Sequence, residues 1–181
     1  MRIEISSSQR EEIDNKYKES ARRLVSFLAE EDNTLLWGSG CRSIMGICYE
    51  EFAKRDREIL GYTTEKYVDE IELLPKATHV VCKDTFDLKK VLFDEADLLV
   101  MLPGGTGTVS ELFAYVEEIR SNDRDKTLII YDEFNHFNKV FELIDDMIER
   151  DFNSKSIYDY IKVAHNLDEF KKIYNSLKME M

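Results

Sequence analysis

Short apolar runs alternate with longer amphipathic segments along the whole chain, and this alternation constrains the fold more than any other feature. The runs have the length of strands, whereas the segments between them repeat apolar residues every three or four positions, as helices do. Strands that alternate with helices favour right-handed crossovers and a mostly parallel sheet with helices on both faces. The strand-like runs are 3–7, 34–37, 58–62, 79–82, 98–102, 127–131 and 160–164.

The helical segments complete this alternation, and the clearest of them carries Phe137, Val140, Phe141, Ile144 and Ile148 on one face. No linker rich in Pro, Gly or Ser divides the chain, and its composition does not change along its length. We therefore expect residues 1–181 to form one α/β domain, a Rossmann-like, doubly wound, mostly parallel sheet. The helical segments are 13–28, 44–55, 88–92, 112–119, 137–148 and 170–177.

Composition excludes several classes of function. The chain has 25 Lys and Arg against 37 Asp and Glu, a formal net charge of -12. Such a surface repels nucleic-acid backbones and anionic lipid heads, so we expect neither a nucleic-acid partner nor a membrane partner. The three cysteines and three histidines show no metal-ligand spacing, which predicts structural thiols in a reducing compartment. No apolar run is long enough to span a membrane, and we expect a cytoplasmic protein.

Ligands of doubly wound sheets bind beyond the carboxyl ends of the strands, where the strand order reverses. The loops that follow strands are therefore the places to look for function. Three of them are unusual: the serine cluster 6–8, the loop 38–46 and the loop 103–111.

The third of these loops, 103–111, has three glycines in four positions, at Gly104, Gly105 and Gly107. Glycines let a ligand approach the backbone, and the free N–H groups at a helix start favour an anion. The hydroxyls of Thr106 and Thr108 add further donors. We expect a phosphate here, although the Gly-Lys-[Ser/Thr] of the nucleoside-triphosphate loop is absent.

Glu111 follows in what the spacing predicts to be the first helical turn. A carboxylate beside a bound phosphate is placed to accept hydrogen bonds from a sugar and to stabilise positive charge on a ribose ring during glycosidic cleavage. The alternative is a capping box, with Thr108 or Gly107 as the cap and Glu111 turned back to the helix start.

The pattern Pro-Gly-Gly-x-Gly-Thr-x-x-Glu at 103–111 resembles the signature of the LOG family, the cytokinin-activating phosphoribohydrolases once named lysine decarboxylases. The loop 38–46, Gly-Ser-Gly-Cys-Arg-Ser-Ile-Met-Gly, resembles that family's Gly-Gly-Gly-x-x-Gly-Leu-Met-Gly. Ser6-Ser7-Ser8 resembles its Gly-Ser-Ser turn. The order of the elements is similar over nearly the whole chain.

The resemblance implies a hydrolase that cleaves the N-glycosidic bond of a nucleoside 5'-monophosphate to free base and ribose 5-phosphate. It implies a homodimer with a small-molecule substrate and no metal or organic cofactor. It assigns catalysis to Glu111, with Arg42 as a candidate partner discussed below. The phosphate would lie on Gly104, Gly105, Thr106, Gly107 and Thr108, and other parts of the substrate on Ser7, Gly38, Ser39, Met45 and Lys89.

The chain departs from the family pattern at a catalytic position. The family has Arg-Lys before its fifth strand; Lys89 matches the lysine, but Leu88 stands where the arginine is expected. Leucine has neither charge nor hydrogen-bond donors, so it cannot replace that arginine. Arg42 is a candidate substitute, and the alternative is a solvated loop arginine. Ser6, Ser39 and Ser43 each replace a family glycine.

Two other functions therefore stay open beside the hydrolase. A phosphate loop without the arginine would suit a non-catalytic nucleotide sensor or carrier of the same fold. A glycosidase or ribosyl transferase acting on a modified pyrimidine nucleotide would keep Glu111 and differ in its base pocket.

Overall fold

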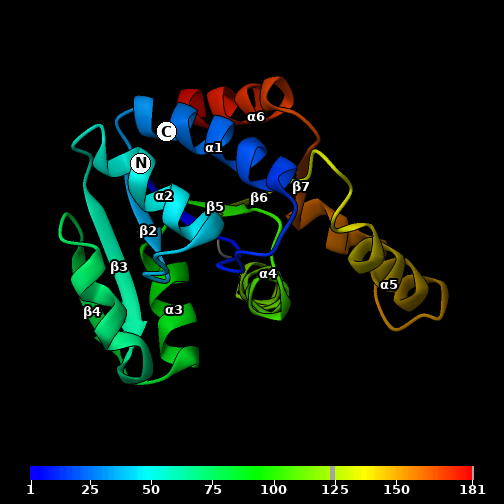
Figure 1. Cartoon of the computed structure of the whole chain (residues 1–181). Coiled ribbons are helices and arrows are strands. Elements are labelled where there is room, and N and C mark those ends of the chain that lie inside the picture. Colours follow the sequence, from blue (N-terminus) through cyan, green and yellow to red (C-terminus); the bar gives the residue numbers. More distant parts are fainter. Residues whose placement is uncertain (123–124, 181) are drawn as a thin grey trace.

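The computed structural model describes residues 1–122 and 125–180, and a parallel sheet runs through its centre (Figure 1). Every strand pairing is parallel, and the seven strands lie in the order β4-β3-β2-β1-β5-β6-β7. The predicted doubly wound α/β fold is confirmed, with strand ends shifted by one or two residues. The strands are β1 (Arg2–Ser6), β2 (Thr34–Trp37), β3 (Ile59–Thr64), β4 (Thr78–Cys82), β5 (Leu98–Met101), β6 (Thr127–Tyr131) and β7 (Lys162–Ala164).

The described residues also form six α-helices and two 3-10 helices, and neither 3-10 helix was predicted from the sequence. The helices are α1 (Asn15–Glu30), α2 (Ser43–Ala53), η1 (Glu65–Leu73), α3 (Thr85–Glu95), α4 (Thr106–Ser121), α5 (Asn138–Glu149), η2 (Lys155–Tyr160) and α6 (Leu167–Glu180).

Two apolar clusters cover the two faces of the sheet, because successive side chains of a strand point to opposite faces. Ile3 and Ile5 of β1 belong to the cluster under α1, α2 and α6. Leu36 and Leu99 of the neighbouring strands belong to the cluster under α3, α4 and α5. Figure 1 shows α1 and α6 on one side of the sheet and α3 and α4 on the other. Each face is thus sealed by helices, and an approaching ligand meets the strand ends.

The strand order reverses at β1, which pairs with β2 on one side and with β5 on the other. The chain moves outward from β1 to β4 and then returns to start the second half of the sheet at β5. Connections on either side of this point diverge, which opens a crevice beyond the carboxyl ends of β1 and β5. The serine cluster and the glycine loop both start there.

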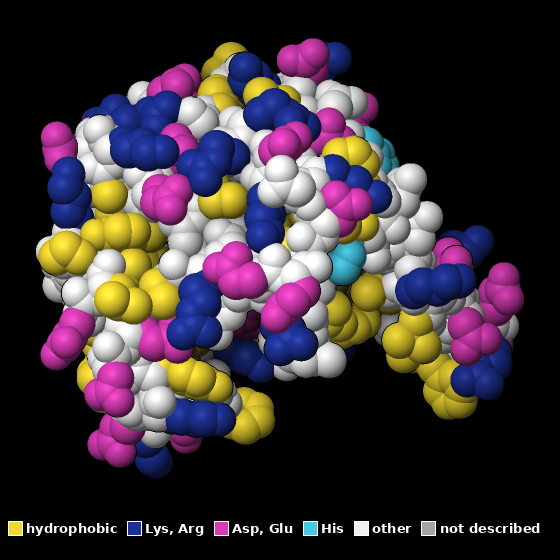
Figure 2. Space-filling view, viewed as in Figure 1, with side chains coloured by type: hydrophobic (Ala, Val, Ile, Leu, Met, Phe, Trp, Pro, Cys, Tyr) yellow, Lys and Arg dark blue, Asp and Glu magenta, His cyan; other side chains and the backbone are white. Residues whose placement is uncertain are grey.

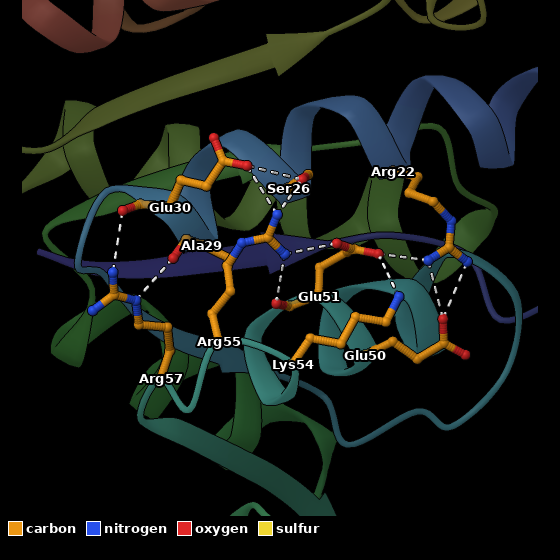
Figure 3. A network of polar contacts seen from close by, with 9 residues as sticks. All are labelled: Arg22, Ser26, Ala29, Glu30, Glu50, Glu51, Lys54, Arg55 and Arg57. Atoms are coloured by element: carbon orange, nitrogen blue, oxygen red, sulfur yellow. Dashed lines mark hydrogen bonds and ion pairs between the residues drawn. The ribbon is translucent and has the colours of Figure 1, made fainter.

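Ion pairs join α1 to α2 along their exposed sides (Figure 3). Glu51 is only 5% exposed and accepts hydrogen bonds from Arg22, Lys54 and Arg55 at 2.6, 2.9 and 2.8 Å. Burial raises the pKa of Glu51, but the bonds from these cations outweigh that effect and lower it to about 2. The network therefore holds an ionised carboxylate between two helices that cover the same face of the sheet.

Figure 2 shows acidic and basic side chains interspersed over the face viewed, in spite of the acidic excess. α5 and the loop after it project from the body of the protein (Figure 1). None of the helices in the described part of the chain has the length and hydrophobicity of a membrane span.

Candidate active site

A cavity of about 270 Å³ lies at the carboxyl edge of the sheet, where the strand order reverses. Its walls come from β1 and the loop after it, the loop after β2, β3, η1, and the starts of α2, α3 and α4. The lining residues are Glu4, Ile5, Ser6, Ser7, Gln9, Gly38, Ser39, Gly40, Met45, Thr63, Thr64, Tyr67, Glu70, Thr85, Leu88, Gly107, Thr108 and Glu111.

Hydrogen bonds tie the three unusual loops together at this edge. The Thr108 hydroxyl donates to the Ser7 carbonyl at 3.3 Å, across 101 positions of sequence. The Met45 N–H donates to the Ser8 carbonyl at 3.1 Å. Residues far apart in the chain are therefore held around one cavity.

The glycine loop leads directly into α4, whose first residue is Thr106 and whose N-cap is Gly105. No side chain caps this helix start, so its first N–H groups point toward the strand ends without a carbonyl partner in the helix. A Cβ atom on Gly105 or Gly107 would meet open space, whereas one on Gly104 would collide with Thr108. Gly104 thus permits the packing of the loop, and Gly105 and Gly107 leave its outer surface bare.

We expected Glu111 in the first turn of the helix, which is wrong. The helix α4 begins at Thr106, earlier than a cap at Gly107 or Thr108 would allow. The capping box is also wrong, since Gly105 is the cap and no side chain bonds to it. Glu111 instead lines the cavity in the second turn. Burial raises the pKa of its carboxyl above the ordinary value, while the Ser6 hydroxyl and the charge of Lys89 lower it.

Glu4 of β1 is a cavity residue that the sequence reasoning missed, whereas Ser6 belongs to the serine cluster singled out above. The Glu4 side chain lies in the middle of the sheet and is 1% exposed. Its Oε1 accepts a hydrogen bond of 2.7 Å from Ser6, and its Oε2 has no partner among the described residues. A signal was present, because a single acid inside the apolar run Ile3–Ile5 departs from the apolar pattern of central parallel strands.

The loop after β2 holds two serines in the left-handed region, Ser39 at φ 55° and Ser43 at φ 51°. This conformation favours glycine, the residue found in the family pattern at both positions. The Ser39 hydroxyl lies 3.1 Å from Nδ1 of His79, whereas the buried Ser43 hydroxyl has no partner among the described residues. Met45 packs over Gly38 and Gly40, where an added Cβ would meet its side chain.

Leu88, the residue that stands where the family pattern led us to expect an arginine, lines the cavity. The neighbouring Lys89 is not among the lining residues; its Nζ donates to the Ser110 hydroxyl at 2.6 Å. Arg42 lies at the rim, 58% exposed in its side chain, and its Nη2 is 3.7 Å from the cavity residue Glu70. Among the described residues, the walls therefore carry three carboxyl groups, from Glu4, Glu70 and Glu111, and no lysine or arginine.

The structure gathers seven of the predicted site residues around the cavity. Gly104 and Gly105 line a second cavity of about 170 Å³ behind the loop, next to Tyr17 and His136. Nε2 of His136 lies 2.8 Å from the Gly104 carbonyl. Thr106 is exposed and lines neither cavity. The residues gathered around the larger cavity are Ser7, Gly38, Ser39, Met45, Gly107, Thr108 and Glu111.

Within residues 1–122 and 125–180, no group of three or more His, Cys, Asp or Glu side chains is suited to holding a metal ion.

Comparisons with known proteins agree with this architecture. A family model described as possible lysine decarboxylase matches residues 45–173. A protein of Mycobacterium marinum named cytokinin riboside 5'-monophosphate phosphoribohydrolase is 26% identical over 152 residues, which is 83% of this chain and 81% of that protein. The protein of the same name from Mycobacterium tuberculosis is 24% identical over 156 residues, with the same coverage of 83% and 81%.

A solved structure of the molybdenum cofactor carrier protein from Chlamydomonas reinhardtii has a TM-score of 0.67 to this chain and covers 98% of each. The two sequences are 13% identical, so this similarity concerns the fold alone.

Proposed function

Since this chain belongs to the LOG family, whose model is described as possible lysine decarboxylase, we propose that it hydrolyses the N-glycosidic bond of a nucleoside 5'-monophosphate. The products are the free base and ribose 5-phosphate. The relatives from Mycobacterium are named for an activity of this kind on cytokinin riboside 5'-monophosphate. For this chain the class of substrate is proposed, and the base is left to experiment.

One observation supports the proposal: Gly107 and Thr108 in the uncapped first turn of α4 line the same cavity as the carboxyl group of Glu111. The uncapped first turn of α4 offers N–H groups to a phosphate, and the helix dipole adds to their attraction. Glu111 lies one turn further along the same helix and lines the cavity. A phosphate held at the helix start thus brings the attached pentose toward the carboxyl group.

The chemistry follows from this arrangement. As the bond between C1' and the base nitrogen breaks, its electron pair leaves with the base and positive charge develops on the ribose. An ionised Glu111 beside the ring stabilises that charge, by the logic of carboxylates in glycoside cleavage. A water molecule then adds to C1' and releases a proton, and the base takes up a proton.

The test is Glu111→Gln in a base-release assay across the common nucleoside monophosphates, including AMP and CMP. The amide keeps the shape of the side chain but removes its charge, so we expect turnover to fall at least about 100-fold, the scale of a lost electrostatic stabiliser. Binding of the nucleotide should change little. A wild-type protein that releases base, and a variant that does so equally well, would contradict the role of Glu111.

The second candidate is a protein that binds the nucleotide without turnover, and Leu88 is the observation that favours it. An apolar side chain lines the cavity where the family arginine is expected. Binding of AMP measured by calorimetry, together with no base release from any nucleotide in the screen, would identify this second function. Arg42, at the rim beside Glu70, is the residue that we propose to replace the arginine if the protein is a hydrolase.

A further inference from the structure

Glu4 occupies an unusual place for an acid. In the sheet it pairs in register with Leu36 of β2 and Leu99 of β5, both fully buried. It is itself 1% exposed, and a buried carboxyl group needs a reason because its desolvation is unfavourable. Within the part of the chain that the structure describes, no lysine or arginine lines the cavity beside it. The usual solution for a buried acid, an ion pair, is therefore not what this site uses.

The direction of the side chain follows from the alternation along β1. Ile3 and Ile5 pack under α1, so Glu4 and Ser6 project to the opposite face, toward α4. Glu4 and Glu111 accordingly line the same cavity. The Ser6 hydroxyl donates to Glu4 at 2.7 Å and also acts on Glu111. Two carboxyl groups from different elements therefore line one cavity together with the Ser6 hydroxyl.

The surroundings leave part of this cluster without partners. Glu4 Oε2 and the Tyr115 hydroxyl are buried and have no hydrogen-bond partner among the described residues. Lys89 from α3 acts on Glu111 by its charge, and the Cys48 thiol from α2 is near enough to be affected by Glu4. These groups, Ser6 and the third cavity carboxyl, that of Glu70, are titratable or polar groups near the pair.

Electrostatics disfavours two charges here. Burial raises the pKa of Glu4 well above its usual range, and repulsion from Glu111 raises it further, against a smaller effect of Ser6. Burial also raises the pKa of Glu111. Two carboxyl groups that share a poorly solvated site cannot both ionise easily, and the pair titrates in two separate steps.

We propose that Glu4 and Glu111 form an acid pair that holds one proton, with Glu4 as a positioning residue that keeps Glu111 aimed at the pentose. Glu4 keeps the proton because it is the more deeply buried, and Glu111 carries the charge. The catalytic part of this inference rests on the proposed function, whereas the shared proton does not.

The first experiment measures the shared proton without any substrate. Urea unfolding of the wild type and Glu4→Gln is followed at a series of pH values from 4.5 upward. An acid whose pKa is raised by folding stabilises the protein below its unfolded pKa and loses that contribution as the pH rises through the folded pKa. The amide cannot ionise, so the unfolding constant of the wild type should rise relative to that of the variant, by up to about tenfold per pH unit.

Two further variants make this result specific. Glu12→Gln removes a carboxyl whose side chain is 80% exposed and should leave the pH trend of the wild type unchanged. In Glu111→Gln the repulsion on Glu4 is removed, so the trend should shift to lower pH. The pair is overturned if the unfolding free energy of Glu4→Gln depends on pH as that of the wild type does. It is also overturned if the effects of Glu4→Gln and Glu111→Gln on that free energy add in the double variant.

The second experiment is the pH profile of kcat/KM for base release. In the wild type we expect a rise as Glu111 ionises and a fall at higher pH as Glu4 loses the shared proton and repels Glu111. Glu4→Gln should keep the rise and lose the fall. If the pH trend in stability appears but no base is released, the acid pair stands and the proposed hydrolase fails. If kcat/KM of Glu4→Gln still falls at high pH as in the wild type, the positioning role is overturned.

Discussion

Single atoms decide the behaviour of the glycine loop and of the loop after β2. A Cβ on Gly104 collides with Thr108, whereas one on Gly105 meets open space. Glycine is therefore needed at these two adjacent positions for different reasons. At Gly104 it permits the packing of the loop, and at Gly105 it leaves room for a ligand. The two replacements therefore separate stability from binding.

Gly105→Ala should weaken the binding of AMP without affecting the fold. The backbone at this residue has φ of -93°, which alanine adopts without strain, while the added methyl group stands where the phosphate would contact the N–H groups. We expect a loss of affinity of at least about tenfold, or 1.4 kcal/mol, in calorimetry. Gly104→Ala is the control and should lower the melting temperature. Unchanged affinity in Gly105→Ala would remove the phosphate from this loop.

Ser43→Gly should stabilise the protein by about 1 kcal/mol, because it relieves a left-handed serine and removes a buried hydroxyl without a partner. Ser39→Gly relieves a similar backbone but gives up the contact with His79, so its gain should be smaller. Urea unfolding of both variants compares them directly. A stability of Ser43→Gly below that of the wild type would show that the serine side chain has a stabilising contact of its own.

At the scale of the elements, α1 and α2 are held together by charge as well as by apolar packing. The carboxylate of Glu51 accepts hydrogen bonds from three cationic side chains. The neighbouring Glu50 carboxylate accepts hydrogen bonds from Arg22 and is 52% exposed. Burial makes the first interaction stronger, since exposed pairs are worth little.

Glu51→Gln should therefore destabilise the protein by about 2 kcal/mol at neutral pH, and Glu50→Gln by less than about 0.5 kcal/mol. The folded pKa of Glu51, about 2, lies below its usual 4.5. Its stabilisation is complete above pH 4.5 and is lost as the pH falls toward 2. Unfolding at pH 7 and at pH 3 measures both effects. Equal losses in the two variants would mean that the carboxylate of Glu51 is as exposed in solution as that of Glu50.

At the scale of the whole molecule, exposed apolar side chains collect at the β4 end of the sheet. Val80 and Val81 of the edge strand are 46% and 48% exposed, and Phe86 at the start of α3 is 80% exposed. β4 and α3 lie at the same end of the protein in Figure 1. Edge strands and apolar patches of this kind favour association.

We accordingly expect a homodimer, as the family resemblance implies. Sedimentation equilibrium at micromolar concentration should yield twice the chain mass of 21.3 kDa. Base release should then fall on dilution below the dissociation constant if the assembled form is the active one. A single species of one chain mass across the concentration range would contradict the expected assembly.

Much of the fold could be predicted because its local signals agree with each other. Leu98–Met101 is a short apolar run, and the residues after Thr106 repeat at helical spacing, so strand and helix follow from neighbouring side chains alone. The ends of elements were harder to predict. Glu111 was placed one turn too early because the start of α4 depends on where the glycine loop leaves the sheet.

The residues of the candidate site divide in the same way. The spacing of the glycines and Glu111 in the sequence indicates a functional site. The spacing of Glu4 does not, because its role depends on which element packs against its face of the sheet. Its neighbour in the cavity is 107 positions away in the sequence, and only the pairing of β1 with β5 brings α4 to it.

The amino-acid order by itself determined the alternating strands and helices, the phosphate-type loop and the missing arginine, since each is a local property of adjacent residues. The tertiary structure decided which carboxyl groups line one cavity, which loops surround that cavity and which glycines face open space. Those outcomes depend on strand order, and strand order brings together segments that no local pattern connects.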